Sequence, residues 1–464
     1  MCNSMHCNDP ACEVDNSAVS LQPAAFSSAT PRADALALLD RFRWNGRRTA
    51  IGRTLVEAGD RRADVKTLTN EFWTSRQRAA HSLHEISYRA CFKPQLPGFF
   101  IERLTGPGHV VYDPFMGRGT TVLEAALMGR VAIGCDVNPL SGMIVAPRLS
   151  PPSLDAVRMR LERIDFSTCD SWPDELLVFY HPETLREICG LREYLGRRAR
   201  RGALDEVDRW IRMVAVNRLT GHSSGFFSVY TLPPNQALSI DSQRRINAIR
   251  RQSPPRRHVP ALILAKSRSL LRNCDEPTLR ALKLTARQYR LLTQSCSATP
   301  EIESGSVDLV VTSPPFLDVV DYAGDNWLRC WFCGIDAASV RLTMVRRLED
   351  WQTAMASVFE ELARVLRPGG HVAFEVGEVR GGRLKLEDAV LPCGLAAGLE
   401  PRLVMINAQQ FTKTANCWGV SNNHKGTNTN RIVVFRRPHR QALPTRARTW
   451  LRCSSPRAAS RTFA

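Results

Sequence analysis

The 464-residue chain lacks several features that would each assign it to a class of protein. It has no run of about 18 apolar residues, which is the length that a helix needs to cross a bilayer. The opening stretch MCNSMHCNDPACEVD lacks the charged and then apolar order of a secretory signal peptide. We therefore predict a cytoplasmic protein that does not span a membrane.

A second pair of cysteines at the spacing of a zinc site is also missing, although the chain has 14 cysteines. Scattered thiols in a long chain of this kind are usually reduced, so we expect no disulfide framework. Cys330 and Cys333 form a lone CxxC pair, which is more typical of buried thiols than of a metal site. Cys2, His6, Cys7 and Cys12 match no ligand spacing, and we expect no metal ion.

Acidic residues are too few to balance the basic ones, because 45 Asp and Glu oppose 63 Lys and Arg and leave a net charge of +18. A basic excess of this size is typical of a protein that binds a polyanion. No amphipathic basic helix stands out, which favours nucleic acid over a membrane. On charge alone, a basic surface without such a partner remains an open alternative.

Strand and helix patterns alternate in two parts of the chain. Residues 109–139, HVVYDPFMGRGTTVLEAALMGRVAIGCDVNP, are patterned as a strand, a glycine-rich turn, a helix and a second, wholly apolar strand. The alternation returns in SVDLVVTSPPF and VFEELARVLRPGGHVAFEVGEV, and PRLVMIN and NRIVVFRR are patterned as a closing pair of strands. These patterns predict an α/β fold with a doubly wound, mainly parallel sheet and one inserted, mostly helical region.

The same changes of pattern give the expected domain boundaries. Residues 1–70 are predicted to be a flexible leader with an N-terminal helix, and residues 71–145 the cofactor-binding half of the sheet domain. The arginine-rich residues 146–285 are predicted to be a basic helical insertion. Residues 286–436 form the catalytic half, and the basic tail 437–464 is expected to be disordered.

The glycine-rich turn DPFMGRGTT predicts a cofactor site. Gly117 and Gly119 let the backbone turn tightly and approach a ligand, and the following helix offers free N–H groups. Asp136 ends the next strand, where an acid commonly binds the two hydroxyls of a ribose. This pattern suits a nicotinamide dehydrogenase and an S-adenosylmethionine-dependent methyltransferase alike, and a purely structural turn is a third reading. Val122 stands where the dehydrogenase pattern needs a third glycine, which favours the methyltransferase.

The four residues Ser313-Pro314-Pro315-Phe316 follow a buried strand and predict the catalytic site. Prolines carry no N–H, so the carbonyl groups beside them are open acceptors. A hydroxyl and such a carbonyl can accept the two N–H bonds of an exocyclic amine on a nucleobase and so localise its lone pair for attack on a methyl group. An aromatic ring such as that of Phe316 can stack on a base that has left the duplex.

The chain resembles the amino-methyltransferases that modify cytosine N(4) or adenine N(6) in DNA, specifically their TSPPY/TSPPF subgroup. The resemblance covers about residues 85–436 and rests on FKPQLPGFFIERL, DPFMGRGTT, IGCDVNPL, VVTSPPF, LRPGG and NHKGTNTNRIVVF. It implies S-adenosyl-L-methionine as the cofactor and Ser313, Pro314, Pro315 and Phe316 as the catalytic residues. It also implies that the cofactor is bound by Phe92, Lys93, Pro94, Asp113, Phe115, Gly117, Gly119, Thr120, Thr121, Asp136 and Asn138.

Two departures from the family pattern matter. Arg118 stands where the family usually has serine, which affects the cofactor loop. The catalytic segment begins with serine and not with aspartate, which in the family is commoner among cytosine N(4) enzymes, so cytosine is favoured over adenine.

In this family an insertion between the two halves carries target recognition. We expect DNA to contact Arg244, Arg245, Arg250 and Arg251 in the basic insertion, and we expect the protein to be nucleoid-associated. A cognate restriction endonuclease is a possible partner. An RNA amino-methyltransferase and an inactive nucleic-acid-binding relative remain as alternatives.

Overall fold

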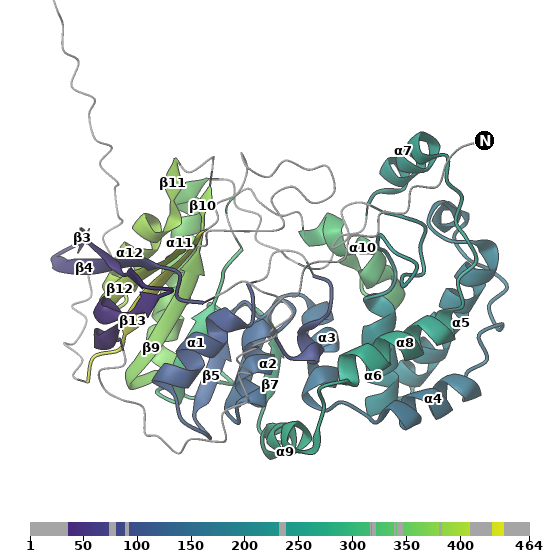
Figure 1. The fold of residues 1–464 in the computed structure, drawn as a ribbon, viewed down its shortest axis with the longest axis horizontal. Coiled ribbons are helices and arrows are strands. Elements are labelled where there is room, and N and C mark those ends of the chain that lie inside the picture. The colour runs from purple at the N-terminus through teal and green to yellow at the C-terminus, as the bar shows by residue number, and fades with distance from the viewer. Residues whose placement is uncertain are drawn as a thin grey trace, which may run out of the picture.

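The computed structural model describes residues 36–73, 80–88, 92–231, 238–315, 317, 322–337, 340, 347–379, 383–408 and 429–439. A nine-stranded sheet with helices on both faces forms the centre of the molecule, and a lobe of helices lies beside it (Figure 1). The predicted α/β fold with a mainly parallel sheet is confirmed.

The central sheet has the strand order β3-β4-β12-β13-β9-β8-β5-β6-β7. Strand β13 is antiparallel to both of its neighbours and β3 is antiparallel to β4, whereas the other neighbours are parallel. Two small hairpins, β1-β2 and β10-β11, lie outside this sheet. The strands are β1 (Arg43–Trp44), β2 (Arg47–Arg48), β3 (Ala50–Ala58), β4 (Arg61–Asn70), β5 (Val110–Asp113), β6 (Val131–Asp136), β7 (Arg290–Thr293), β8 (Val307–Thr312), β9 (Leu366–Val376), β10 (Glu378–Val379), β11 (Leu384–Lys385), β12 (Glu400–Ala408) and β13 (Thr429–Arg436).

Most helices begin at a residue whose side chain caps the first turn, as Ser153 does for α4 and Asp205 for α6. The helices are α1 (Gln95–Leu104), α2 (Thr120–Leu127), α3 (Pro139–Leu149), α4 (Leu154–Arg163), α5 (Pro182–Arg200), α6 (Glu206–Val216), α7 (Ile240–Arg250), α8 (Val259–Leu271), α9 (Glu276–Thr285), α10 (Tyr322–Cys333), α11 (Leu348–Val365) and α12 (Leu386–Ala396). Short 3-10 turns are η1 (Ala37–Arg41), η3 (Ser82–His84) and η4 (Asp174–Val178).

Alternate residues of the central strands supply two cores, one on each face of the sheet. In β8, Leu309 and Val311 join the core that packs against α1, α2 and α3, whereas Val307 and Val310 join the core beneath α11 and α12. Successive side chains of a strand point to opposite faces, so a strand covered on both sides must be apolar throughout. This requirement explains the apolar run Leu309 to Val311, which is followed by Thr312 and Ser313.

The prediction that residues 1–70 are a flexible leader with a helix is wrong for the part that the structure describes. Residues 37–41 form a single 3-10 turn, and β3 and β4 form a long hairpin that continues the central sheet. Strand β4 pairs in parallel with β12, whose residues lie more than three hundred positions later in the chain. A pairing partner so distant leaves no local pattern, which is why the sequence did not reveal this strand.

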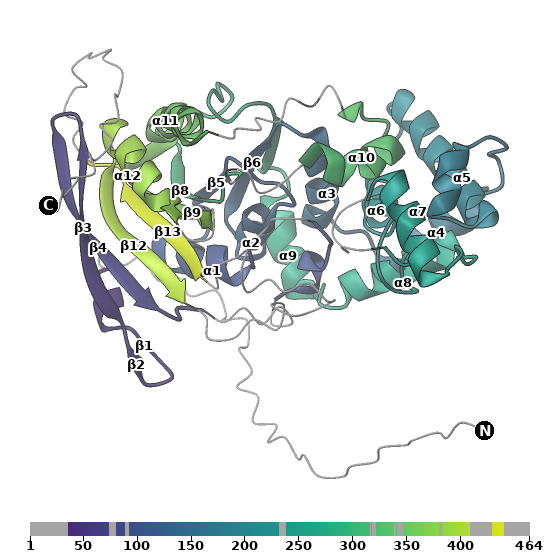
Figure 2. The same ribbon diagram turned by 90° about the horizontal axis from the view of Figure 1, so that it is seen from above.

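The insertion is helical, as its sequence pattern predicts. Helices α4 to α9 form a lobe that packs on α2 and α3 and shares their core. Trp210 is fully buried in the lobe, and its indole N–H donates a 3.0 Å hydrogen bond to the hydroxyl of Ser267. The shared core holds the lobe firmly beside the sheet (Figure 2). Within the described ranges, no helix is long and apolar enough to cross a bilayer.

Candidate active site

The glycine-rich turn lies between the end of β5 and the start of α2. Gly117 and Gly119 both have positive φ angles, 48° and 73°, which only glycine adopts at little cost. A methyl group at Gly119 would lie 2.4 Å from Cγ2 of Val145 on α3, so the turn packs too closely for a side chain. Gly119 is the N-cap of α2 and has no side chain with which to bond the first N–H groups of the helix. Those donors and the positive end of the helix dipole suit an anion.

Asp136, at the end of the neighbouring strand β6, holds this turn in place. Its Oδ2 accepts a 2.9 Å hydrogen bond from the backbone N–H of Gly117, and its Oδ1 accepts a 2.8 Å bond from that of Asn138. Burial raises the pKa of Asp136, and these hydrogen bonds oppose the rise. Each carboxylate oxygen can accept a further hydrogen bond, so the partly exposed group is both oriented and able to bind hydroxyls.

Arg118, the residue that departs from the family pattern, is buried and hydrogen-bonded within the fold. Its buried guanidinium donates to the backbone carbonyls of Ile86 and Phe92, at 3.2 Å and 3.3 Å, and to the hydroxyl of Thr120 at 3.0 Å. The carbonyl of Arg118 in turn accepts a hydrogen bond from the fully buried Arg148. The arginine therefore fastens the segment around Phe92 to the glycine turn.

Asp113 joins the glycine turn to β8, the strand that precedes the predicted catalytic segment. Its Oδ1 accepts a 2.6 Å hydrogen bond from the hydroxyl of Thr312 and a 3.1 Å bond from the backbone N–H of Phe115. Burial raises the pKa of the Asp113 carboxyl to about 7, although these bonds oppose the rise. Because Thr312 immediately precedes Ser313, the carboxyl of Asp113 sets the two halves of the site relative to each other.

Ser313, Pro314 and Pro315, the first three residues of the predicted catalytic segment, follow the carboxyl end of β8. The carbonyl of Pro315 accepts a 2.9 Å hydrogen bond from the indole N–H of Trp351 on α11. Glu375, on the neighbouring strand β9, is buried, which raises the pKa of its carboxyl, and hydrogen bonds from Ser313 and Asn430 oppose that rise. A serine that donates to Glu375 keeps its oxygen lone pairs for another donor. Phe316 lies outside the described residues.

The other predicted cofactor residues divide into two groups. Phe92, Lys93 and Pro94 lie directly before α1, where Pro94 is the N-cap. The side chains of three others are engaged within the fold. Thr120 accepts from Arg118, the hydroxyl of Thr121 donates to the carbonyl of Val311 at 3.0 Å, and Oδ1 of Asn138 caps α3 through the N–H of Leu140 at 2.9 Å. That these residues bind a cofactor stays a prediction.

The predicted DNA-binding arginines lie on and directly after α7, which is at the top of the helical lobe in Figure 1. All four are exposed. Arg244 donates to Asp241 at 2.9 Å, and the guanidinium of Arg250 lies 3.9 Å from the ring centroid of Tyr230. That these four arginines contact DNA remains a prediction.

The sequence analysis did not identify three residues that contact the predicted site residues, namely Thr312, Trp351 and Glu375. Thr312 and Trp351 carry no pattern of their own, because their importance depends on which backbone groups the fold brings near them. Glu375 did leave a signal, since it is the only charged residue in the strand pattern HVAFEV. A carboxyl group in a strand buried on both faces needs a partner, and that requirement alone could have singled it out.

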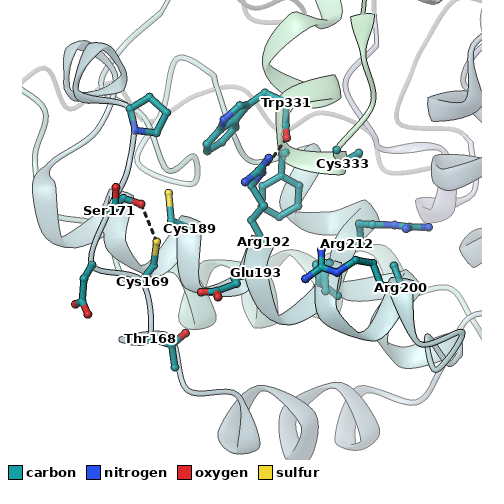
Figure 3. Close-up of a pocket in the computed structure, with 17 residues that line it drawn as sticks. Thr168, Cys169, Ser171, Cys189, Arg192, Glu193, Arg200, Arg212, Trp331 and Cys333 are labelled. Carbon is teal, nitrogen blue, oxygen red and sulfur yellow. Dashed lines mark hydrogen bonds between the residues drawn. The ribbon is translucent and has the colours of Figure 1, made fainter.

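The helical lobe also contains a cavity of about 550 Å³, shown in Figure 3. It is lined by α5, α6, the residues 168–173 and the end of α10. Arg192 crosses it and donates a 2.9 Å hydrogen bond to the carbonyl of Trp331. None of the predicted catalytic or cofactor residues lines this cavity. Among the described residues, no three His, Cys, Asp or Glu side chains are grouped to hold a metal ion.

Residues 47–140, from β2 to the first residues of α3, match the family model N6_N4_Mtase, described as DNA methylase. The chain is related to the DNA amino-methyltransferases. It is 22% identical over 317 residues to the Type II methyltransferase M.BsoBI of Geobacillus stearothermophilus, an alignment that covers 60% of this chain and 58% of that protein. It is 36% identical over 74 residues to the Type II methyltransferase M.MjaII of Methanocaldococcus jannaschii, which covers 16% of this chain and 14% of that protein.

The chain therefore spans less than two thirds of the length of these two Type II methyltransferases. Among solved structures, TrmN from Thermus thermophilus aligns with a TM-score of 0.29 and 13% identity, over 77% of this chain and 51% of that chain. The predicted relationship to the family is confirmed, and membership of the TSPPY/TSPPF subgroup stays a prediction.

Proposed function

We propose that this protein transfers a methyl group from S-adenosyl-L-methionine to an exocyclic amino group in DNA, at cytosine N(4) in preference to adenine N(6). The observation that carries the proposal is the hydrogen bond between Thr312 and Asp113. It brings together a glycine turn suited to a nucleoside cofactor and a Ser-Pro-Pro segment suited to an amine. Both lie at the carboxyl ends of neighbouring parallel strands, where α/β sheets bind their ligands.

The residues of the turn fit S-adenosylmethionine. The Asp136 carboxylate is oriented to accept from the two ribose hydroxyls, and the free N–H groups at the start of α2 suit the carboxylate of the methionine part. Gly117 leaves space in the turn, since a methyl group there would approach no atom closer than 3.7 Å, and a ligand can use that space. The cofactor supplies a methyl group on a sulfonium, which is already a good leaving group.

The Ser-Pro-Pro segment prepares the amine. An exocyclic amine is a poor nucleophile because its lone pair is delocalised into the base. The oxygen of Ser313 and the carbonyl of Pro314 would accept its two N–H bonds and favour a tetrahedral nitrogen. The Ser313 hydroxyl donates its hydrogen bond to the carboxyl of Glu375, and the indole N–H of Trp351 donates to the carbonyl of Pro315. These two contacts leave Ser313 and Pro314 as the acceptors for the substrate.

The substrate base must leave the duplex to reach this segment, and Phe316 would stack on it. The exposed arginines of α7 would bind the phosphates of the flanking DNA. The related proteins are Type II methyltransferases by name, which supports a site-specific enzyme that accompanies a restriction endonuclease.

Single-turnover transfer of a labelled methyl group into DNA, followed by nucleoside analysis, tests the proposal. Ser313→Ala should slow the transfer by roughly a hundred- to a thousand-fold, which is the usual loss for one preorganised hydrogen-bond partner. The affinity for S-adenosylmethionine in calorimetry should not change. Glu375→Gln should also slow the transfer, because an amide can donate to Ser313 and disturb its orientation.

Ser306→Ala is the matched control, because Ser306 lies just before β8 and bonds only the nearby carbonyl of Glu303 at 2.7 Å. It should transfer methyl groups at the parent rate. The expected product is N(4)-methylcytosine, and N(6)-methyladenine would correct only the choice of base. A 5-methylcytosine product, or full activity in Ser313→Ala, would show that the segment does not act as proposed.

A further inference from the structure

Strand β3 is the outermost strand of the central sheet, at the end opposite β7 (Figure 2). Within the described ranges it pairs with β4 on one side only. It is nine residues long, AIGRTLVEA, and contains no proline. A long edge strand of this kind presents a row of unpaired backbone groups, and natural proteins usually cover or block such an edge.

The hairpin geometry determines which backbone groups of β3 face outward. The two-residue turn at Gly59 and Asp60 closes on the pair of Ala58 with Arg61. A turn of this length closes on a pair that exchanges both backbone hydrogen bonds, and bonded and non-bonded pairs then alternate along the ladder. Every second residue from Ala58 therefore bonds β4. The residues between them direct their N–H and C=O groups outward: Ile51, Arg53, Leu55 and Glu57.

The side chains of these four residues share one face of the strand. Ile51 is 53% exposed and Leu55 is 64% exposed, which is unusual for large apolar side chains in a sheet. Arg53 and Glu57 carry opposite charges and lie two positions before and after Leu55. If a second copy of the strand is turned by 180° about Leu55 and placed alongside, Arg53 of each strand therefore lies opposite Glu57 of the other.

We propose that β3 pairs antiparallel with β3 of a second copy of this chain, with the two-fold axis at Leu55. In this register Leu55 faces Leu55 of the second copy, and Arg53 of each copy faces Glu57 of the other. An axis one residue away would set a charged side chain opposite Leu55. An axis two residues away would set Arg53 or Glu57 opposite itself, and like charges directly opposite each other destabilise a sheet. Charge therefore selects the register centred on Leu55.

This pairing is compatible with the site at the strand ends. A two-fold axis between antiparallel edge strands is perpendicular to the sheet, so the parallel strands of the two copies point in opposite directions. The two Ser-Pro-Pro segments would then lie on opposite edges of the joined sheet, and each would remain open. The present partners of the charged residues, Asp64 for Arg53 and Arg62 for Glu57, are exposed ion pairs that are each worth at most about 1 kcal/mol.

Two charge reversals test the register. Sedimentation velocity over a concentration series should show a dimer for the parent chain. Arg53→Glu alone and Glu57→Arg alone should each be monomeric where the parent is dimeric, because each homodimer would contain two like-charged pairs. An equimolar mixture of the two variants should form a dimer again, since both pairs are complementary in the heterodimer.

Arg158→Glu is the matched control, because Arg158 is 55% exposed and pairs with an exposed Asp155, much as the 58% exposed Arg53 pairs with Asp64. It should dimerise like the parent. Circular dichroism and thermal melting should show that all variants are folded. The proposal is overturned by a parent chain that stays monomeric at every concentration, by single variants that remain dimeric, or by a mixture that stays monomeric. None of these results depends on methyl transfer, so they leave the proposed activity unaffected.

Discussion

The hydroxyl of Thr312 donates a 2.6 Å hydrogen bond to the carboxyl of Asp113, although the two residues lie 199 positions apart in the chain. Both side chains are buried, at the ends of the neighbouring strands β8 and β5. Asp113 begins the glycine turn and Thr312 precedes Ser313. A single contact therefore couples the region that would hold the cofactor to the region that would hold the base.

Thr312→Val should lower the free energy of unfolding by about 1–3 kcal/mol, because valine has the same shape and leaves the buried carboxyl of Asp113 without its hydroxyl donor. Chemical denaturation measures the loss. Thr312→Ser keeps the donor and should retain most of the stability. Equal stability of the valine and serine variants would mean that the hydrogen bond contributes nothing.

The pH dependence of stability should reveal the Asp113 carboxyl. Burial raises its pKa from an ordinary value of 3.8 to about 7, so the folded state holds this proton over a range in which the unfolded chain has lost it. The resulting stabilisation is complete below about pH 4 and is lost as the pH rises through 7. In the parent chain this group lowers the free energy of unfolding by up to about 1.4 kcal/mol for each pH unit between about pH 4 and pH 7. Asp113→Asn should remove this contribution.

Denaturant unfolding at several values between pH 4 and pH 8 tests the Asp113 prediction. Asp308→Asn serves as a comparison, because Asp308 lies at the opposite end of β8 and its carboxyl accepts from the N–H of Val110 at 2.7 Å. Identical slopes for Asp113→Asn and the parent chain would contradict the raised pKa.

Arg118→Ala should loosen the segment that precedes α1. The substitution leaves the carbonyls of Ile86 and Phe92 without their donor, and each unpaired buried group costs about 1–3 kcal/mol. Hydrogen exchange should become faster in residues 84–88, in residues 92–95 and in the glycine turn, and the affinity for S-adenosylmethionine should fall. Arg103→Ala removes an arginine that bonds only within α1 and its own neighbour, so exchange in the turn should stay slow.

Neutralising Arg244, Arg245, Arg250 and Arg251 should weaken DNA binding at low salt. The slope of the logarithm of affinity against the logarithm of salt concentration should decrease by about one unit per lost phosphate contact. Fluorescence anisotropy with a duplex measures this slope. Neutralising Arg197, Arg200 and Arg201, which are exposed at the carboxyl end of α5 and directly after it, provides the comparison. A salt slope unchanged from the parent chain would place the DNA surface elsewhere.

Much of the site was predictable because its signals are local. The turn at Gly117 and Gly119 needs residues that tolerate positive φ, and the acid at Asp136 follows an apolar strand. Two consecutive prolines after a buried strand were equally visible. The turn, the acid and the Ser-Pro-Pro segment follow the neighbouring strands β5, β6 and β8, and the carboxyl ends of these parallel strands meet at one edge of the sheet.

The sequence by itself determined the alternation of strands and helices, the glycine turn and the helical insertion, because side-chain period and backbone preference act over a few residues. Only the tertiary structure decided that the hairpin β3-β4 extends the sheet, that Arg118 ties the turn to Phe92, and that Glu375 faces Ser313. These contacts join positions far apart in the chain. They depend on backbone groups that every residue carries and on the packing of whole elements, so no short stretch of residues records them.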